Sequence, residues 1–244
     1  MRIYTRELGQ NYSTYSFGYT LHAEVESGDD LATVYAGGFL PYSHKPGPNL
    51  FYMARSLRLR VEDFSPTSEN RRVFQKYDGQ FTVTYRSGSE IGESAHFKDL
   101  FLHYFNERHG SSVMPEARME DILQKDLPLR LACYAKDGTP VAYVLEVTGP
   151  TYLHYWFSCY ELSYANSALG MWLMLDSVRR ATAEGLTHVY VGTGYGQKAK
   201  YKTNIPNLSF WDGTTWNDDE KKLKELLQTD QGRETTATSA LYTR

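Results

Sequence analysis

Three lysines within five residues follow a glycine-rich turn in the last quarter of the sequence. The stretch YVGTGYGQKAKYKTN covers residues 190–204 and contains Gly192, Lys198, Tyr201 and Lys202. Glycine permits close approach of a backbone or a ligand. Lys198 and Lys202 are four residues apart, so on an α-helix they would project together, with Tyr201 packing or stacking beside them. The pattern predicts contacts with phosphate groups; the alternative is a turn followed by a solvated basic helix.

A second candidate site is the sequence NSALG at residues 166–170, which precedes a long apolar helical pattern. Backbone N–H groups at the start of a helix bind anions, and Ser167 and Gly170 would lie beside such a ligand. An oxyanion formed during acyl transfer would fit the same place. The alternative is a simple helix cap made by the side chain of Asn166 or Ser167.

A general base is expected just past the strand TYLHYWFSC, at residues 151–159. Glu161 is the best-placed carboxylate, and Tyr160 is a weaker candidate. The alternative is that Glu161 is an ordinary glutamate in a surface loop, without a catalytic role. We expect His154 to be a packed core histidine and Cys159 a buried small residue, since nothing near Cys159 in the sequence would activate its thiol.

Arginines form a third candidate cluster. Arg71 and Arg72 belong to a predicted short helix next to the strand that carries Arg58. Together they would form a basic patch for nucleic-acid phosphates. The alternative is an exposed surface that is ion-paired with Glu62, Asp63 and Glu69.

Composition limits the class of protein. The chain has 244 residues, 41% of them hydrophobic, which suffices for one large domain or two small ones. A net charge of −3 argues against bulk coating of nucleic acid. Two cysteines make neither a disulfide framework nor a cysteine-based zinc site, so we expect no metal and no cofactor. No apolar run nears the length of about 18 residues that spans a membrane, and no signal peptide is visible, so a cytoplasmic protein is expected.

Periodicity predicts the elements that must position these residues. Residues 12–62 are rich in β-branched and aromatic residues, and we expect strands there, including LATVYAGGF at 31–39. A short helix is expected at 68–79, capped by Ser68, and a strand at 80–86. Residues 90–109 predict one helix with an apolar face. A further helix is expected at 116–124.

The strongest regular block follows at residues 127–192. It predicts a hairpin turning at Asp137-Gly138, a third strand, a long helix at 168–185 and a fourth strand. A charged helix is expected at 217–228. The order of hairpin, strand, long helix and strand predicts an α+β, GNAT-like acyltransferase fold. We expect a β-rich subdomain at 1–89, on the acceptor side, a transferase domain at 90–228 and a flexible tail at 229–244.

Four ordered stretches resemble the arginyl-tRNA–protein transferase family over residues 34–216. They are Gly38-Phe39, RLRVEDFSPTSENRRVFQK at 58–76, WFSCYELSYANSALG beginning at Trp156, and YVG followed by KAKYK. The bacterial branch that transfers leucine onto N-terminal Asp or Glu is the most similar. The sequence lacks that family's N-terminal cysteine cluster and its G-F-R-R-S-G motif. An aspartate-proline pair is replaced by Ser158-Cys159-Tyr160.

The resemblance implies an aminoacyl-tRNA-dependent transferase that forms an amide on a protein or peptide amine, such as the N-terminus of an N-degron substrate. It implies that Gly38, Phe39, Arg58 and Trp156 join the substrate-binding residues, and that Lys198 and Lys202 contact the tRNA 3′ end. Acyl-CoA enzymes of this fold have a loop of the form R/Q-x-x-G-x-G/A before the long helix, and NSALG lacks it. The alternatives are an acyl-CoA N-acyltransferase, a non-catalytic tRNA- or N-degron-binding relative, and a transferase acting on a small molecule.

Overall fold

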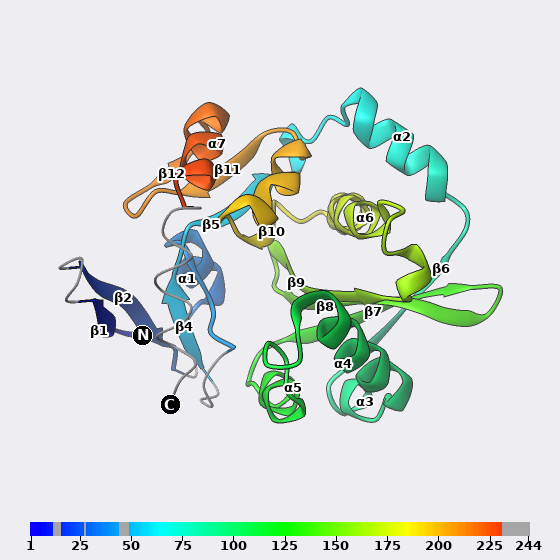
Figure 1. Ribbon diagram of the computed structural model, residues 1–244, viewed down its shortest axis with the longest axis horizontal. Coiled ribbons are helices and arrows are strands. Elements are labelled where there is room, and N and C mark those ends of the chain that lie inside the picture. The colour runs from blue at the N-terminus through cyan, green and yellow to red at the C-terminus, as the bar shows by residue number, and fades with distance from the viewer. Residues whose placement is uncertain (12–15, 27, 44–48, 231–244) are drawn as a thin grey trace. The chain divides into compact units, whose positions relative to one another are not determined.

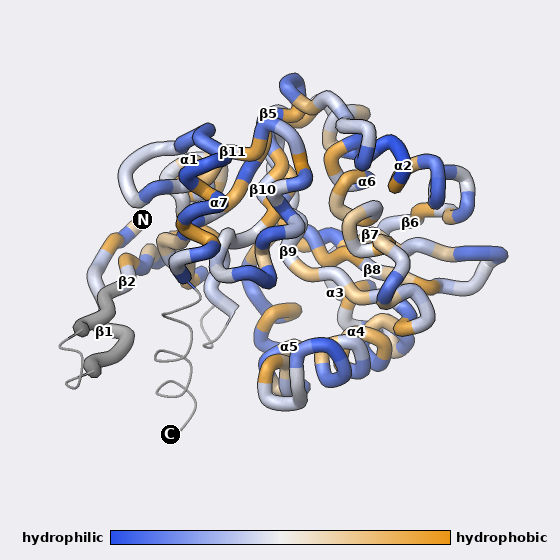
Figure 2. The backbone as a smooth tube through the Cα atoms, turned by 45° about the horizontal axis from the view of Figure 1, so that its top comes forward, coloured by the Kyte–Doolittle hydropathy of each residue, from blue (hydrophilic) through white to orange (hydrophobic). Residues whose placement is uncertain are grey.

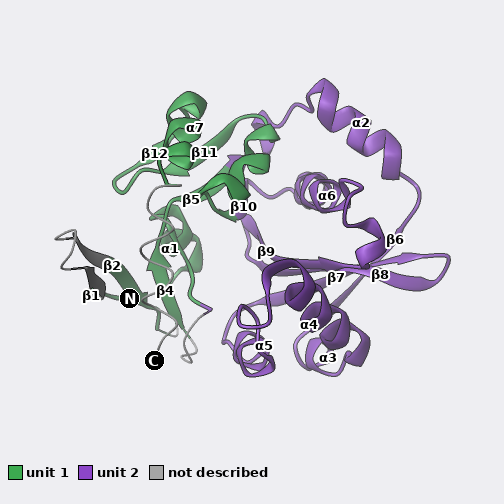
Figure 3. Cartoon of the chain, viewed as in Figure 1, with its two compact units in different colours: residues 1–42, 49–58, 192–244 green, residues 43–48, 59–191 purple. Residues whose placement is uncertain are grey.

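The computed structural model describes residues 1–11, 16–26, 28–43 and 49–230 (Figure 1). The chain forms two compact units (Figure 3). Unit 1 comprises residues 1–42, 49–58 and 192–244, and unit 2 comprises residues 43–48 and 59–191. This division differs from the predicted boundary at residue 89, since unit 1 gathers segments from both ends of the sequence. Most of the predicted tail, from residue 231 onward, lies outside the described residues.

Unit 1 contains a four-stranded antiparallel sheet in the order β1-β2-β4-β3. Its strands are β1 (Arg2–Asn11), β2 (Ser16–Glu24), β3 (Phe39–Pro41) and β4 (Leu50–Met53). The remaining elements of the unit are α1 (Leu31–Ala36), the 3₁₀ helix η3 (Gln197–Asn204), β11 (Leu208–Trp211), β12 (Trp216–Asn217) and α7 (Glu220–Thr229). The chain passes between the units within β5 (Ser56–Arg60) and β10 (His188–Thr193).

The prediction of a strand over residues 31–39 is wrong for its first part, which is helix α1. The side chain of Asp30 caps this helix by accepting a hydrogen bond from the Ala32 N–H at 3.0 Å. Gly37 ends the helix, and only Phe39 and the two residues after it form a strand. The local cap therefore outweighs the strand preference of the β-branched and aromatic residues.

Unit 2 is a sheet between two helical layers (Figure 1). Its strands run in the order β10-β9-β8-β7-β6, antiparallel except that β10 is parallel to β9. They are β6 (Thr82–Ser87), β7 (Leu129–Lys136), β8 (Thr139–Thr148), β9 (Tyr152–Tyr160) and β10. Helix α6 (Leu169–Ala183) lies on one face with α2 (Ser68–Tyr77) packed on it, and α3 (Ser89–Gly92), α4 (Ala95–His109) and α5 (Glu116–Leu123) lie on the other. The short turns η1 (Val61–Asp63) and η2 (Leu162–Tyr164) complete the unit.

This architecture confirms the predicted α+β, GNAT-like fold with a β-rich N-terminal part. The hairpin turns at Asp137 and Gly138, which have φ angles of 51° and 80°. The apolar face predicted for 90–109 is buried, but the segment is two helices, because the backbone of Ser94 is not helical (φ −80°, ψ 89°). Within the described residues, no helix is long and apolar enough to cross a membrane.

Helices α2 and α6 differ in polarity (Figure 2). Helix α6 is largely apolar and buried, whereas α2 is mostly hydrophilic. The predicted cap of α2, Ser68, is wrong: the cap is Thr67. The Thr67 hydroxyl accepts from the Asn70 N–H, and the Asn70 side chain accepts from the Thr67 N–H. This reciprocal pair satisfies two N–H groups at the helix start.

A buried carboxylate links α6 to the sheet of unit 2. The side chain of Glu146 on β8 is fully buried and forms ion pairs with Arg130 on β7 and Arg180 on α6. Arg180 also pairs with Asp176 at 3.1 Å, and Tyr134 donates to Asp176 at 2.9 Å. Every charge in the cluster has an opposite partner, so removal of one member would leave an uncompensated buried charge.

Candidate active site

The lysine segment in unit 1 forms the 3₁₀ helix η3. With three residues per turn, Lys198 and Tyr201 share one face of this helix, and Ala199 and Lys202 share another. Lys198 is exposed and Tyr201 is 46% exposed, whereas Ala199 is buried and Lys202 is half-buried. The expectation that Lys198 and Lys202 project together is therefore wrong, because it assumed α-helical spacing.

Lys202 turns inward onto the glycine-rich turn. Its Nζ donates a hydrogen bond to the Thr193 carbonyl oxygen at 3.0 Å. Gly192 has a φ of 78°, and a Cβ at this position would lie 3.3 Å from Nζ, so the close approach that Gly192 permits includes the Lys202 ammonium group. Burial lowers the pKa of Lys202 from 10.5 to about 8. An amine with this pKa is suited to accept a proton near neutral pH.

Arg55 and Asp230 hold the same turn in place. The Arg55 guanidinium donates to the Gly194 carbonyl oxygen at 3.0 Å and to Asp230 at 2.6 Å. Asp230 also accepts from the Gly196 N–H at 3.1 Å, and the Tyr195 hydroxyl accepts from the Arg55 N–H at 2.7 Å. Sequence reasoning missed this cluster, because its members come from three separate segments and form no motif.

Two of the other predicted residues of unit 1, Gly38 and Arg58, pack against tryptophans. The ring of Trp211 lies over Gly38, so close that a Cβ there would be 2.4 Å from its atoms. The guanidinium carbon of Arg58 lies 4.0 Å from the ring centroid of Trp216, a cation–π contact. Phe39 is buried in β3. These placements account for Gly38, Arg58 and Phe39 by packing, and their substrate roles stay predictions.

In unit 2, helix α6 starts without the cap by Asn166 or Ser167 that the sequence suggested. The cap residue is Ala168, with a left-handed φ of 64°, and no side chain caps the helix. The Ser167 hydroxyl donates to the Tyr164 carbonyl oxygen. The Ser167 carbonyl oxygen accepts from Lys76 Nζ at 2.9 Å and from the Tyr77 hydroxyl. Capping by Asn166 or Ser167 is therefore wrong, and the role of the helix start as an anion site stays a prediction.

Of the two candidate base residues, Tyr160 lies beside this helix start. The Tyr160 hydroxyl would be 3.2 Å from a Cβ at Gly170, so this glycine makes room for the tyrosine in the first turn of α6. Tyr160 is buried, with its ring centroid 4.7 Å from that of Tyr104. Burial and the hydrogen bond to Tyr160 raise the pKa of Tyr104 well above its usual value. Glu161 is half-buried, and its N–H donates to the Val141 carbonyl oxygen.

The two residues set aside as core residues are buried as expected. His154 is 1% exposed and Cys159 is fully buried. Burial raises the pKa of the Cys159 thiol well above its usual value, which makes it a poor nucleophile.

The remaining predicted residues lie elsewhere in unit 2. Arg71 and Arg72 are exposed on α2, and Arg71 donates to the Pro66 carbonyl oxygen at 2.6 Å. Trp156 is half-buried on β9. Arg60, on the strand that carries Arg58, pairs with Glu62 and Asp63, two of the acidic residues named in the alternative. None of the ion pairs among the described residues involves Arg58, Arg71 or Arg72, so the basic patch stays a prediction.

A family profile described as an acetyltransferase (GNAT) domain matches residues 67–203, more than half of the chain. The chain belongs to the GNAT family. The match in this GNAT protein runs from α2 through the sheet and α6 of unit 2, and then through the glycine-rich turn to Lys202. It therefore covers every site residue predicted from the sequence except Gly38, Phe39 and Arg58.

Curated relatives of this GNAT chain confirm the resemblance seen in its motifs. It is 29% identical over 167 residues to an aspartate/glutamate leucyltransferase of Methylorubrum extorquens, a match covering 62% of this chain and 66% of the relative. It is 27% identical over 175 residues to the enzyme of the same name from Cereibacter sphaeroides, covering 67% and 61%. The chain thus spans less than two thirds of the length of these relatives. Among solved structures it is similar to FemX, with 12% identity, a TM-score of 0.44, and coverage of 71% of this chain and 62% of that chain.

Proposed function

We propose that this protein is an aminoacyltransferase that moves the aminoacyl group of a charged tRNA onto an amine of a protein or peptide. The observation that carries the proposal is the match to aspartate/glutamate leucyltransferases over 62–67% of this chain, together with the GNAT profile over residues 67–203. Charged tRNA is a cytoplasmic donor, and we propose the cytoplasm as the place of action.

The proposed transfer reaction requires the enzyme to position two substrates and to remove a proton from the attacking amine. The amine attacks the ester carbonyl carbon, the amide bond forms, and the tRNA 3′-hydroxyl leaves. Positioning two substrates is worth about 7–11 kcal/mol in favourable cases. The amine must lose a proton, and Lys202, with its pKa of about 8, joins Glu161 and Tyr160 as a candidate acceptor.

The donor contacts follow from which side chains are exposed. Lys198 and Tyr201 share the outer face of η3, so this face offers one cation and one stacking ring to the tRNA 3′ end. Arg71 and Arg72 on α2 offer further cations for phosphates. Lys202 is assigned to the proton and not to a phosphate, because its ammonium group is turned toward the Thr193 carbonyl.

The deciding experiment offers charged tRNA and acetyl-CoA to the same protein. Purified protein is incubated with tRNA pools, each charged with one labelled amino acid, and with peptides covering every N-terminal residue. We expect label to pass from one charged tRNA to peptide. Label passing only from acetyl-CoA would make the protein an ordinary acyltransferase. Binding of tRNA without any transfer would identify a non-catalytic relative.

Replacing Lys198 by alanine is expected to weaken tRNA binding and to reduce the slope of log K against log salt concentration by about 0.7–0.9, the loss of one phosphate contact. Lys202→Met is expected to leave that slope unchanged, because its ammonium group faces inward. Binding is measured by filter retention at several salt concentrations. The control is Lys221→Ala, an exposed lysine on α7. Equal slopes for Lys198→Ala and the unaltered protein would remove η3 from the tRNA contacts.

A further inference from the structure

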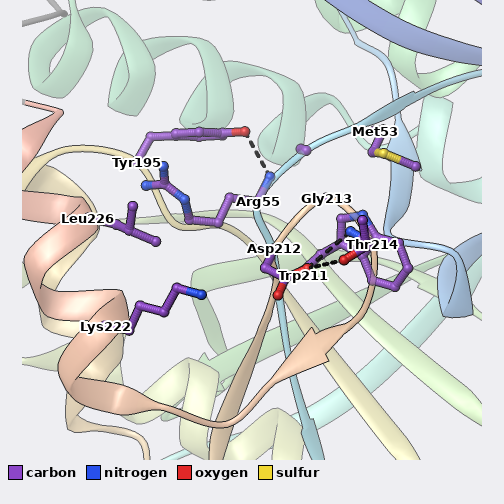
Figure 4. Close-up of a pocket in the computed structure, with 10 residues that line it drawn as sticks. Met53, Arg55, Tyr195, Trp211, Asp212, Gly213, Thr214, Lys222 and Leu226 are labelled. Carbon is purple, nitrogen blue, oxygen red and sulfur yellow. Dashed lines mark hydrogen bonds between the residues drawn. The ribbon is translucent and has the colours of Figure 1, made fainter.

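Unit 1 contains a cavity of about 440 Å³ that the proposed transfer does not use (Figure 4). It is bounded by the end of β4, the turn after β11 and helix α7. The walls combine apolar, aromatic and charged side chains, among them Met53, Tyr195, Trp211, Asp212, Lys222 and Leu226.

One part of the cavity suits an uncharged body. Met53 and Leu226 supply apolar surface, and Trp211 and Tyr195 supply aromatic rings. Tyr195 is 45% exposed, and the guanidinium carbon of Arg55 lies 4.8 Å from the centroid of its ring. Within the described part of the chain, the indole N–H of Trp211 is buried and has no hydrogen-bond partner. This N–H is closed to solvent, so Trp211 offers a ligand its ring and not this donor.

The charged lining residues are of both signs. Arg55 is neutralised by Asp230, which leaves Asp212 and Lys222. The Asp212 carboxylate accepts from the N–H groups of Thr214 and Thr215 at 3.0 Å, and these bonds keep its pKa at about 2, so it is ionised at neutral pH.

Lys222 is exposed and has no carboxylate partner among the described residues. In Figure 4 it extends from α7 toward the turn that carries Asp212. The cavity therefore presents one anion and one cation, each available to a ligand.

This pair of charges decides between ligand classes. A phosphate-bearing ligand would meet the Asp212 carboxylate with like charge, and a wholly apolar ligand would leave both charges unused. A small zwitterion satisfies both. We infer that this cavity binds a free α-amino acid with an apolar side chain. The α-ammonium group lies at Asp212, the carboxylate at Lys222, and the side chain against Met53, Leu226 and Trp211.

The test uses three probes that share one side chain and differ in their charged groups: L-phenylalanine, L-phenylalaninamide without the carboxylate, and N-acetyl-L-phenylalanine without the ammonium group. Binding is measured by isothermal titration calorimetry, with no tRNA present. Failure here would therefore leave the proposed transfer untouched. The variants are Asp212→Asn and Lys222→Gln, and Lys221→Gln on the same helix but outside the cavity is the matched control. Asparagine keeps the oxygen that accepts from the two threonine N–H groups, so the turn is retained.

Each variant should act on two probes and spare the third. Asp212→Asn is expected to weaken the binding of L-phenylalanine and of L-phenylalaninamide about tenfold, which is the effect of one charge-assisted hydrogen bond. The affinity for N-acetyl-L-phenylalanine should not change. Lys222→Gln is expected to weaken the binding of L-phenylalanine and of N-acetyl-L-phenylalanine about tenfold. The affinity for L-phenylalaninamide should not change. Lys221→Gln should change none. Absence of L-phenylalanine binding up to about 10 mM would overturn the inference. Equal affinity of all three probes, or losses unrelated to charge, would overturn it too.

Discussion

Replacing Glu146 by glutamine is expected to lower the free energy of unfolding of unit 2 by about 3 kcal/mol, the largest effect on stability that the structure predicts. Glu146 is fully buried between Arg130 and Arg180. Removing its charge leaves two guanidinium groups in a site with little water. Asp176 and Glu184 still pair with these arginines, which places the loss at the lower end of the range for broken buried ion pairs.

The loss is measured by native-state amide hydrogen exchange in β7, β8 and β9, because two compact units need not unfold in one step. Glu184→Gln is the matched control. It removes the other carboxylate from Arg130, but Glu184 is 35% exposed and should cost less than about 1 kcal/mol. Equal effects of the two substitutions would mean that burial of Glu146 does not make its charge important.

Replacing Lys202 by methionine is expected to lower the transfer rate about 100-fold at neutral pH, which is the usual loss on removal of a general base. In the unaltered protein the rate should rise with pH through about 8, because the deprotonated amine is the proton-accepting form. The methionine variant should lose that rise. Lys200→Met, an exposed lysine on the same helix, is the control and should keep both rate and pH profile.

The same lysine makes a second prediction that does not need activity. The folded pKa of about 8 lies below the ordinary value of 10.5, so between these two pH values the unfolded chain binds a proton that the folded chain does not. Stability therefore rises with pH across this window, and the penalty for burying the ammonium group is complete below it. Because the side chain is half-buried and screened, we expect a rise of about 1 kcal/mol, absent in Lys202→Met. A flat profile in the unaltered protein would show that Lys202 is not desolvated.

Sequence reasoning located elements best where period and turn chemistry agreed. The hairpin at Asp137-Gly138 and the apolar face of α4 emerged because side-chain spacing alone determines them. Helix α1 was missed, because LATVYA carries strand-favouring residues and one aspartate cap decides its state. The orientation of Lys202 was missed for a different reason. The sequence does not distinguish a 3₁₀ helix, with three residues per turn, from an α-helix, with 3.6. The helix type nevertheless decides which lysine turns inward.

The site was predictable where chain neighbours build it and unpredictable where distant segments do. Gly192 and Lys202 belong to one stretch, and that stretch was identified. Arg55 and Asp230 are 175 residues apart, and no spacing rule joins them. The cavity beside them combines the end of β4, Tyr195, the turn after β11 and helix α7, so only the folded chain reveals it.

The division of the chain into units imposes an order on its synthesis. Unit 2 is built almost entirely from the continuous segment 59–191, whereas unit 1 needs residues on both sides of that segment. After the first 58 residues are made, 133 further residues are synthesised before the C-terminal part of unit 1 begins. This takes roughly 7–27 s at bacterial and eukaryotic elongation rates. During this interval β5 lacks its neighbouring strand β11. Translation speed and chaperone capture of the nascent N-terminal segment thus become determinants of the yield of folded protein.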